Sequence, residues 1–400
     1  MARTILVVGS GFAGLWAALA AARVLDQHSV MDVEVALVSP QPQLALRPRL
    51  HEGDPAAWST DISPHLQAAG IRYIQGAVQR VHRQDSHVEL AGADGAIQSV
   101  AYDRLVLAAG SAMHRPAIPG LEQYAYSIDQ AADAAELDAH LKTLAARPDT
   151  PSRNTFVIAG AGFTGIELAC ELPGRLQTML PGVQPRIVLV EQEAAVGPDL
   201  GGGPRPVIEQ ALDSLGIERL LGQAVTALDA GGVVLANGER IASATVIWTG
   251  GMRASALAAQ VAAATDALGR AVVDADLRVP GGGGIFAAGD AAAAITDDDG
   301  HHTLMACQHA LVTGRYAGHN AACDLLGLPT QLYRQPVYVT CLDLGGWGAV
   351  FTQGWQRDVA MAGADAKDLK IKINTQWIYP PAPQRAQLLA AADPEQAFKG

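Results

Sequence analysis

The chain has 400 residues, 49% of them apolar, which allows two or three domains that each bury a core. Abundant glycine (42 residues) and few aromatic residues (5%) favour an α/β fold with many tight strand-to-helix turns over an aromatic-rich β-barrel. A net charge of −12 without a Lys/Arg cluster argues against nucleic acid as a partner, because phosphate binding depends on clustered basic side chains.

The cysteines are too widely separated for a secreted disulfide scaffold or for paired metal ligands. We therefore expect a reducing, cytoplasmic setting and no metal ion. The cysteines are Cys170, Cys307, Cys323 and Cys341.

A short apolar run, residues 4–8, leads into a glycine-rich turn and a helical stretch over residues 15–25. Residues 5–25 also have the outline of a signal peptide, but a nucleotide-binding turn explains the glycines better. In such a turn one glycine permits the tight bend, a second lets a pyrophosphate approach the backbone, and a third lets helix and strand pack closely. The turn residues expected to bind a dinucleotide are Gly9, Gly11, Phe12, Ala13 and Gly14.

The same arrangement returns about 150 residues later, with a strand at 155–159 and a helix at 166–172. Each copy is followed by a second strand, residues 33–38 and 186–190, as a βαβ unit requires. One glycine turn alone is weak evidence, whereas two in matching contexts predict two dinucleotide sites. The glycines of the second turn are Gly160, Gly162 and Gly165.

The ends of the second strands indicate which dinucleotide binds where. Glu191 can accept hydrogen bonds from both ribose hydroxyls and would repel a 2′-phosphate, which favours NADH at the second turn; a solvated glutamate is the alternative. The first copy has Ser39 and Pro40 there, so FAD at the first turn would be held without an acid.

Further segments support FAD at the first turn. Residues 102–111 and 244–251 are predicted buried strands that end in small residues, which suits backbone packed against a dinucleotide. Asp290 follows a third such strand and could bind a ribityl hydroxyl or act as a helix N-cap. The further residues expected to contact a cofactor are Val78, Ala109, Gly110, Gly250 and Gly289.

These motifs resemble the two-dinucleotide-fold flavoproteins, most closely the type II (alternative) NADH:quinone oxidoreductases, over residues 9–387. The resemblance implies that Gly289 and Asp290 bind FAD. It also implies that Glu167 lies near the nicotinamide and the flavin, whereas a first-turn acid that complements the helix dipole is the alternative.

Residues 305–310, with Gly314 and Arg315, are similar to the family's segment beside flavin and quinone, although Cys307 before Gln308 makes the match partial. A helix is predicted over residues 303–326, with its positive N-terminus toward the flavin. We expect Cys307 and Gln308 to contact the cofactor. Gln308 and His309 are candidate catalytic residues; His309 either supplies a proton, with both charge states accessible near pH 7, or caps the surface.

A thiol relay is not expected, because residues 42–65 hold no cysteine of the kind that disulfide reductases of this superfamily carry. Sulfide:quinone reductases use cysteines but generally lack an intact NADH site, so we interpret Cys170 and Cys341 as small buried residues. The loop at residues 47–52 is charged where an apolar lining would suit a quinone. Arg47 or Arg49 either binds the FAD pyrophosphate or an anionic acceptor, or belongs to a solvated loop.

The expected fold is α/β, with two Rossmann-like dinucleotide-binding domains and a C-terminal α+β segment. We place the FAD domain at residues 1–120 and 270–325, the NADH domain at 121–269 and the C-terminal segment at 326–400, with strands at 337–341 and 347–352. Glycines interrupt the apolar residues 245–264, so no membrane span is expected, and residues 383–400 have only a weak apolar stripe. At most, peripheral contact with the inner face of a membrane is expected, and the segment could form a homodimer interface.

Three functions remain open: an NADH:quinone reductase, an NADH-dependent flavin reductase or oxidase for a small molecule, oxygen or a protein carrier, and a non-catalytic FAD/NADH redox sensor. The charged loop and the weak apolar tail favour the second. Measurement of turnover with different electron acceptors distinguishes these three functions.

Overall fold

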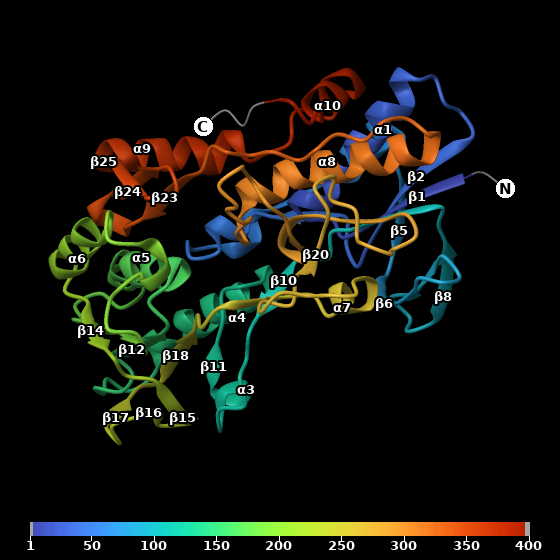
Figure 1. Ribbon diagram of the computed structural model, residues 1–400. Coiled ribbons are helices and arrows are strands. Elements are labelled where there is room, and N and C mark those ends of the chain that lie inside the picture. Colours follow the sequence, from blue (N-terminus) through green and yellow to red (C-terminus); the bar gives the residue numbers. More distant parts are fainter. Residues whose placement is uncertain (1–2, 397–400) are drawn as a thin grey trace.

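The N-terminal apolar run becomes the central strand of a parallel sheet (Figure 1). The computed structural model describes residues 3–396. The sheet has five parallel strands in the order β21-β9-β1-β2-β5, so a strand from late in the chain completes it. The strands are β1 (Arg3–Val8), β2 (Val33–Ser39), β5 (Arg72–Gln75), β9 (Arg104–Leu107) and β21 (Ile285–Ala287).

Different layers cover the two faces of this sheet. Ile5 and Val7 pack toward helices α1 (Phe12–Gln27) and α8 (Cys307–Leu326), whereas Leu6 and Val8 share a core with a small antiparallel sheet. A strand with both faces covered is apolar throughout, which explains the uninterrupted run in the sequence. The small sheet consists of β6 (Ala77–His82), β7 (His87–Ala91) and β8 (Ile97–Ala101), next to the short helix α7 (Leu257–Val261).

Helices α1 and α8 cross with their backbones in contact. A Cβ atom at Gly314 would lie 2.4 Å from the carbonyl oxygen of Ala13, and one at Gly318 would lie 1.9 Å from that of Ala17. The prediction that α8 begins near residue 303 was wrong by about one turn. The backbone N–H of Thr303 donates to the carbonyl of Ala294, so this segment pairs with an earlier loop before the helix begins.

The second sheet matches the first at four of its five strand positions, but its edge strand β11 precedes the central strand in the chain, whereas β21 comes after all the other strands of the first sheet. Its parallel strands run β11-β18-β12-β13-β14, with β12 in the central position that β1 has in the first sheet. Helices α4 and α5 cover one face and a three-stranded sheet covers the other. The elements are β11 (Ala125–Tyr126), α4 (Ala131–Thr143), β12 (Thr155–Ala159), α5 (Phe163–Met179), β13 (Arg186–Glu191), β14 (Glu218–Leu221), β15 (Val225–Asp229), β16 (Gly232–Leu235), β17 (Arg240–Ala242) and β18 (Thr245–Trp248).

This architecture confirms the expected α/β fold with two Rossmann-like units. The apolar residues 245–264 form β18, β19 (Met252–Ala254) and α7, and none of the helices within residues 3–396 is long and apolar enough to span a bilayer. The boundaries near residues 120, 269 and 325 remain predictions. The other elements are β3 (Gln43–Ala45), β4 (Ser59–Asp61), α2 (Ser63–Ala69), α3 (Leu121–Tyr124), α6 (Arg205–Ser214), β20 (Ala271–Val272) and β22 (Ala292–Ala293).

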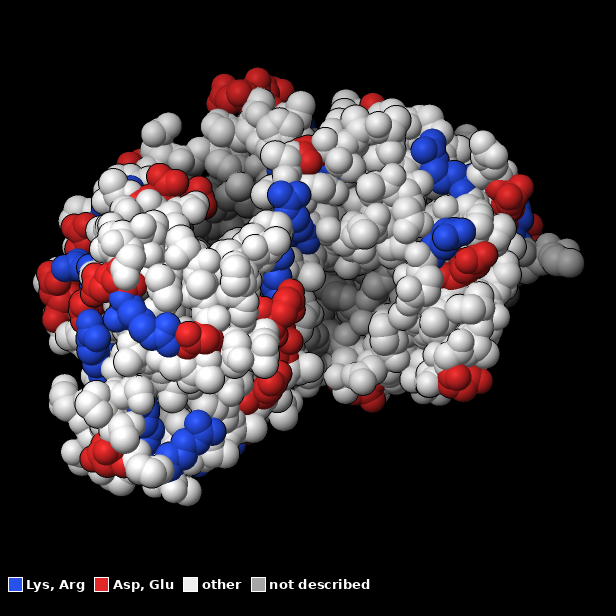
Figure 2. Space-filling view, turned by 90° about the horizontal axis from the view of Figure 1, so that it is seen from below, with Lys and Arg blue, Asp and Glu red and all other residues white. Residues whose placement is uncertain are grey.

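A short antiparallel pair joins the two units at equivalent places. Strand β10 (Ser111–Met113), which follows β9, pairs with β19, which follows β18. Backbone hydrogen bonds of 2.9 Å connect Ser255 to Gly110 and His114 to Gly251. The carboxyl ends of both parallel sheets therefore meet at one junction. Figure 2 shows a hollow between the two lobes of the molecule. In open α/β sheets, ligands bind at such carboxyl ends.

The C-terminal segment packs on both units. A Cβ atom at Gly345 would lie 2.0 Å from the carbonyl oxygen of Cys170 in α5, while Leu388 and Leu389 of the last helix join the core around α1. The two predicted strands of this segment occur about two residues later than expected. The elements are β23 (Val339–Asp343), β24 (Ala349–Gln353), β25 (Asp358–Gly363), α9 (Ala364–Lys372), a π-helix (Ile373–Trp377) and α10 (Arg385–Ala391). The last four residues of the predicted tail lie outside the described residues.

Candidate active site

In the first glycine turn, a Cβ atom would fit at one glycine and would clash at the other two. Gly9 has φ +112°, and a Cβ atom on it would lie 2.2 Å from the carbonyl oxygen of Ala108. A Cβ atom on Gly14 would lie 1.9 Å from the carbonyl oxygen of Gly9, whereas one on Gly11 would meet no atom within 4 Å. The backbone is therefore exposed at Gly11, where α1 begins and no acidic side chain occupies its first turn. Such an N-terminus favours a phosphate.

The second turn reproduces this geometry. Gly160 has φ +114°, a Cβ atom on Gly165 would lie 1.9 Å from the carbonyl oxygen of Gly160, and Gly162 faces open space. The first turn of α5 also carries no acidic side chain. Phe12 and Ala13 in the first turn are buried at the start of α1, so their backbone rather than their side chains faces the open side.

Glu191 ends β13 beside the second turn and is 7% exposed. Its two carboxylate oxygens accept hydrogen bonds from the backbone N–H groups of Ala161 (2.7 Å) and Glu193 (3.0 Å). The solvated alternative is therefore wrong. Each carboxylate oxygen keeps a free lone pair, because an ionised carboxylate offers about four acceptor positions.

Ser39 at the end of β2 is 3% exposed, and its hydroxyl donates to the carbonyl of Gln41 at 2.6 Å. Its hydrogen is already used, so this side chain can offer a ribose only an acceptor. Pro40 beside it is exposed, and Val78 on β6 and Ala109 after β9 are partly buried. A Cβ atom on Gly250 would lie 2.4 Å from the Trp248 ring.

Arg47 links the two units instead of lying in a solvated loop. Its guanidinium forms ion pairs with Asp129, just before α4, and with Asp290 (3.3 Å) in the first unit. Asp290 also accepts a hydrogen bond of 2.6 Å from the Ser111 hydroxyl. Asp290 caps no helix with its side chain, so the N-cap alternative is wrong. Arg49 pairs with Glu52 (2.7 Å) and is not free to bind an anion.

Gln308, in the first turn of α8, forms hydrogen bonds with the C-terminal segment. Its side-chain amide donates to the carbonyl of Val339 at 2.7 Å and accepts from the N–H of Val339 at 3.4 Å. The preceding Cys307 lies near both Lys370 and Asp290, and burial raises the pKa of its thiol to about 11. The start of α8 therefore lies where the first unit and the C-terminal segment meet.

His309 is 1% exposed, and burial lowers its pKa to about 4. The expectation that both of its charge states are accessible near pH 7 was wrong, and so was the surface-cap alternative. Its Nδ1 lies 3.2 Å from Oε1 of Gln335, which can only accept, so Nδ1 carries the hydrogen. Its Nε2 has no hydrogen-bond partner among residues 3–396.

Glu167 lies in a buried charge cluster near the start of α5. Its Oε1 accepts from the Lys370 ammonium (2.8 Å) and from the backbone N–H of Asp343 (3.0 Å). The Lys370 ammonium also lies 5.6 Å from the ring of Phe163, the first residue of α5. The alternative role, a first-turn acid that only complements the helix dipole, is wrong because a buried lysine neutralises the carboxylate.

His51 completes this cluster. Its Nδ1 lies 3.7 Å from Glu167 and its Nε2 lies 3.8 Å from Asp343, which also pairs with Lys367 (2.5 Å). Burial alone would lower the pKa of His51, but the two carboxylates outweigh it and raise that pKa above the ordinary value of 6.5. Burial would also lower the pKa of Lys370, and Glu167 reverses this in the same way. Two carboxylates and two ammonium groups balance when His51 is neutral.

Sequence reasoning missed several of these residues. Lys370 and Asp343 come from the C-terminal segment, about 200 residues from Glu167, and no local sequence pattern predicts their contact with it. Asp129, the partner of Arg47, is also a single acid before a helix. His51 does lie in the charged loop that the sequence singled out.

Thiol chemistry finds no support in this geometry. All four cysteines are free, and burial raises the pKa of Cys341 to about 11 and that of Cys170 further. A thiol with such a pKa is almost entirely protonated at pH 7 and therefore a poor nucleophile.

Comparison with known proteins identifies the family. Residues 3–314 match the model of the pyridine nucleotide-disulphide oxidoreductases. The chain belongs to this family. It is 48% identical over 396 residues to an NADH dehydrogenase-like protein of Mycobacterium tuberculosis, with 98% of each chain covered. It is 25% identical over 398 residues to the type II NADH:quinone oxidoreductase of Staphylococcus saprophyticus, covering 94% of this chain and 95% of that one.

The structure of NDH2 from Plasmodium falciparum in complex with NADH has the same fold, with a TM-score of 0.78, 14% identity and 98% of both chains covered. These findings confirm the resemblance stated from the motifs, the assignment as an NADH-dependent flavin oxidoreductase and the cofactor pair of FAD and NADH. The residues present fit both cofactors, because each glycine turn leaves one backbone face open and pairs it with a helix N-terminus.

Proposed function

We propose that this protein oxidises NADH through bound FAD and passes the electrons to a quinone-type acceptor. The observation that carries the proposal is the junction of the two parallel sheets, where the carboxyl end of each sheet presents its own glycine turn. The similarity to a type II NADH:quinone oxidoreductase supports the quinone as acceptor.

The residues of the junction have different roles in cofactor binding. The backbone at Gly11 and Gly162 would hold the two pyrophosphates, and Glu191 would bind the adenosine ribose of NADH through its remaining lone pairs. Asp290, oriented by Ser111 and Arg47, would bind the ribityl chain of FAD. FAD, when bound, supplies the ring that accepts a hydride and later releases two electrons. The protein's task is placement, since hydride transfer depends on how closely and how well the two rings are aligned.

The charge cluster has a separate task near the second turn. Lys370 pairs with Glu167 and fixes its position, and His51 can hold a proton between Glu167 and Asp343. Quinone reduction consumes one proton beyond the hydride from NADH, and a buried histidine with a raised pKa can hold one near neutral pH. We assign Glu167, Gln308 and His309 to the reaction site; His309 acts there as a neutral side chain.

A second candidate is an NADH-dependent flavin reductase or oxidase that serves another acceptor. It is favoured by the charged loop, whose Arg47 and Arg49 are both paired, and by α10, whose Leu388 and Leu389 pack against the protein. These leucines are not available for a membrane surface. Peripheral membrane contact and a homodimer remain predictions.

Anaerobic stopped-flow spectroscopy tests the proposal. NADH should bleach the flavin absorbance of the FAD-loaded protein, and a short-chain quinone should restore it much faster than dissolved oxygen does. Ferricyanide, which accepts electrons from most reduced flavins, is the control for an intact reduced enzyme. Equal or slower reoxidation by every quinone would assign the second candidate, a stable reduced complex with all acceptors would indicate a redox sensor, and a flavin that stays yellow under NADH would refute all three.

A further inference from the structure

The β6–β7 hairpin brings three metal-ligand side chains to one face, far in sequence from the glycine turns. His82 and His87 are directly opposite each other in the antiparallel register. Glu89 follows His87 by two residues and therefore points to the same side of the sheet. Opposed residues of an antiparallel pair have Cβ atoms about 4.5–5.5 Å apart, close enough for their side chains to bind one ion.

We propose that His82, His87 and Glu89 form a binding site for one divalent transition-metal cation of the Zn²⁺ type. The ligand atoms of the three side chains lie within 4.8 Å of one another. In a tetrahedral zinc site with bonds of about 2.0–2.1 Å, ligand atoms lie about 3.3 Å apart. Small side-chain rotations would therefore close the site. Two histidines and one glutamate with an open fourth position make up a known zinc ligand set.

His82 and Glu89 are close together, but their contact does not have the geometry of a hydrogen bond. Nε2 of His82 lies 3.0 Å from Oε1 of Glu89, yet it is buried and has no hydrogen-bond partner among the described residues. The rings of His82 and His87 are stacked with centroids 4.2 Å apart and an interplanar angle of 11°. A cation engages the lone pairs of both rings and of the carboxylate at once.

The hairpin is held firmly behind these ligands. The backbone N–H of Val81 donates to Oε1 of Gln260 at 2.9 Å, and Val81, Val88 and Leu90 are buried in the core on the opposite face. The ligands therefore project from a fixed backbone. A site on a rigid strand pair loses less conformational entropy on binding than one on a loop.

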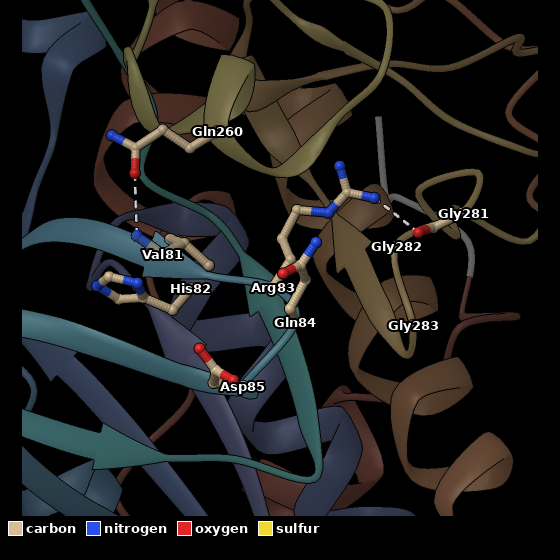
Figure 3. A pocket seen from close by; sticks show the side chains of 9 residues that line it. All are labelled: Val81, His82, Arg83, Gln84, Asp85, Gln260, Gly281, Gly282 and Gly283. Atoms are coloured by element: carbon tan, nitrogen blue, oxygen red, sulfur yellow. Dashed lines mark hydrogen bonds between the residues drawn. The ribbon is translucent and has the colours of Figure 1, made fainter.

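The surroundings leave access for the ion. In Figure 3 the imidazole of His82 points away from Arg83, whose guanidinium reaches the carbonyl oxygen of Gly281 at 2.6 Å. His82 also lines a cavity of about 550 Å³ between the β6–β7 turn and the Gly281–Gly283 loop. Water can therefore fill the fourth coordination position. The separated cysteines give no sign of this site, because its ligands come together only when the hairpin forms.

A second group of suitable side chains, Asp297, Asp299 and His301, is a weaker candidate. The carboxylate of Asp297 already accepts hydrogen bonds from the backbone N–H of His301 (3.1 Å) and from its Nδ1 (2.8 Å). A cation there would have to displace both. This group serves as the competing site in the test.

Isothermal titration of ZnCl₂ into the FAD-loaded, tag-free protein tests the proposal. The wild type should bind one equivalent, and His87→Gln and Glu89→Gln should each weaken binding at least tenfold, because loss of even an outer partner of a metal site weakens affinity about 10–100-fold. His28→Gln changes an exposed histidine outside both groups and should leave binding unchanged. His301→Gln should also leave it unchanged.

The folded state of each variant is checked by its flavin spectrum and its melting temperature. EPR of the protein with one equivalent of Cu²⁺ gives an independent readout, since two imidazole ligands produce nitrogen superhyperfine splitting that His87→Gln should reduce to that of one. The proposal fails if the wild type binds no Zn²⁺ at millimolar concentration. It also fails if binding survives the hairpin variants unchanged, or if it is lost in His301→Gln.

Discussion

Replacement of Lys370 by methionine would leave a buried carboxylate without its counter-ion. The ammonium and the Glu167 carboxylate are each 6% exposed and 2.8 Å apart. Methionine has nearly the length of lysine, so the substitution removes the charge with little change in volume. Glu167 would keep the N–H of Asp343 but no ammonium group. The sum of charges over residue 370, Glu167, Asp343, Lys367 and a neutral His51 would change from zero to −1.

The expected loss of stability is large. Removal of one partner from a buried ion pair typically costs about 3–5 kcal/mol. A chain of 400 residues has an unfolding entropy of about 0.8 kcal/mol/K at about 2.1 cal/mol/K per residue, so the melting temperature should fall by about 4–6 °C if the molecule unfolds as one unit. Independent unfolding of one part would make the drop larger in that part.

The loss should depend on pH through His51. Lys370 lowers the pKa of this histidine, so its removal raises that pKa further above 6.5, and the histidine keeps its proton to higher pH. A group with a raised pKa in the folded state contributes stability that is complete below its unfolded pKa and disappears as pH rises through the folded pKa. The Lys370→Met variant should therefore lose less at pH 6 than at pH 9.

Scanning calorimetry of the FAD-loaded protein at both pH values measures this. Lys372→Met, on the exposed side of the same helix, is the control and should change the melting temperature by less than about 1 °C. The double variant Glu167→Gln/Lys370→Met should recover part of the loss, because the glutamine still accepts from Asp343 without a charge. A Lys370→Met protein as stable as the control, or more destabilised at pH 6 than at pH 9, would refute the account of the cluster.

Three further outcomes are expected. Gly11→Ala should lower the ratio of FAD to protein while the apoprotein melts normally, since its Cβ atom faces open space; Gly14→Ala should destabilise the apoprotein itself, because its Cβ atom would lie 1.9 Å from a carbonyl oxygen. If the soluble Gly11→Ala and Gly14→Ala proteins contained the same amount of FAD, the assignment of this turn as the FAD site would be contradicted. Glu191→Gln should raise the KM for NADH about tenfold and reduce the preference for NADH over NADPH in steady-state assays. If the ratio of kcat/KM for NADH to kcat/KM for NADPH did not change, Glu191 would have no role in cofactor selection. His309→Asn should leave the shape of the kcat/KM profile between pH 6 and 9 unchanged, because a side chain with a pKa of about 4 does not titrate there, and loss of an inflection near pH 6.5 would show otherwise.

Local sequence was sufficient for the two nucleotide-binding units. An apolar run, a glycine turn and a helix interact within about 25 residues, and the turn geometry depends on glycines that no other residue replaces easily. The repeat of that pattern predicted two sheets, and the structure shows two five-stranded parallel sheets, each with the strand before its glycine turn in the centre. The glutamate at the end of β13 was recognisable for the same reason, because its position is counted from the turn.

Tertiary structure alone decided the contacts across the junction. Arg47 and Asp290 are separated by 243 residues and Glu167 and Lys370 by 203, and a long-range ion pair leaves no periodic trace in the sequence. Burial likewise decided the charge of His309 and the coupling of His51, because the cost of placing a charge away from water depends on the whole surrounding shell and not on neighbours in the chain.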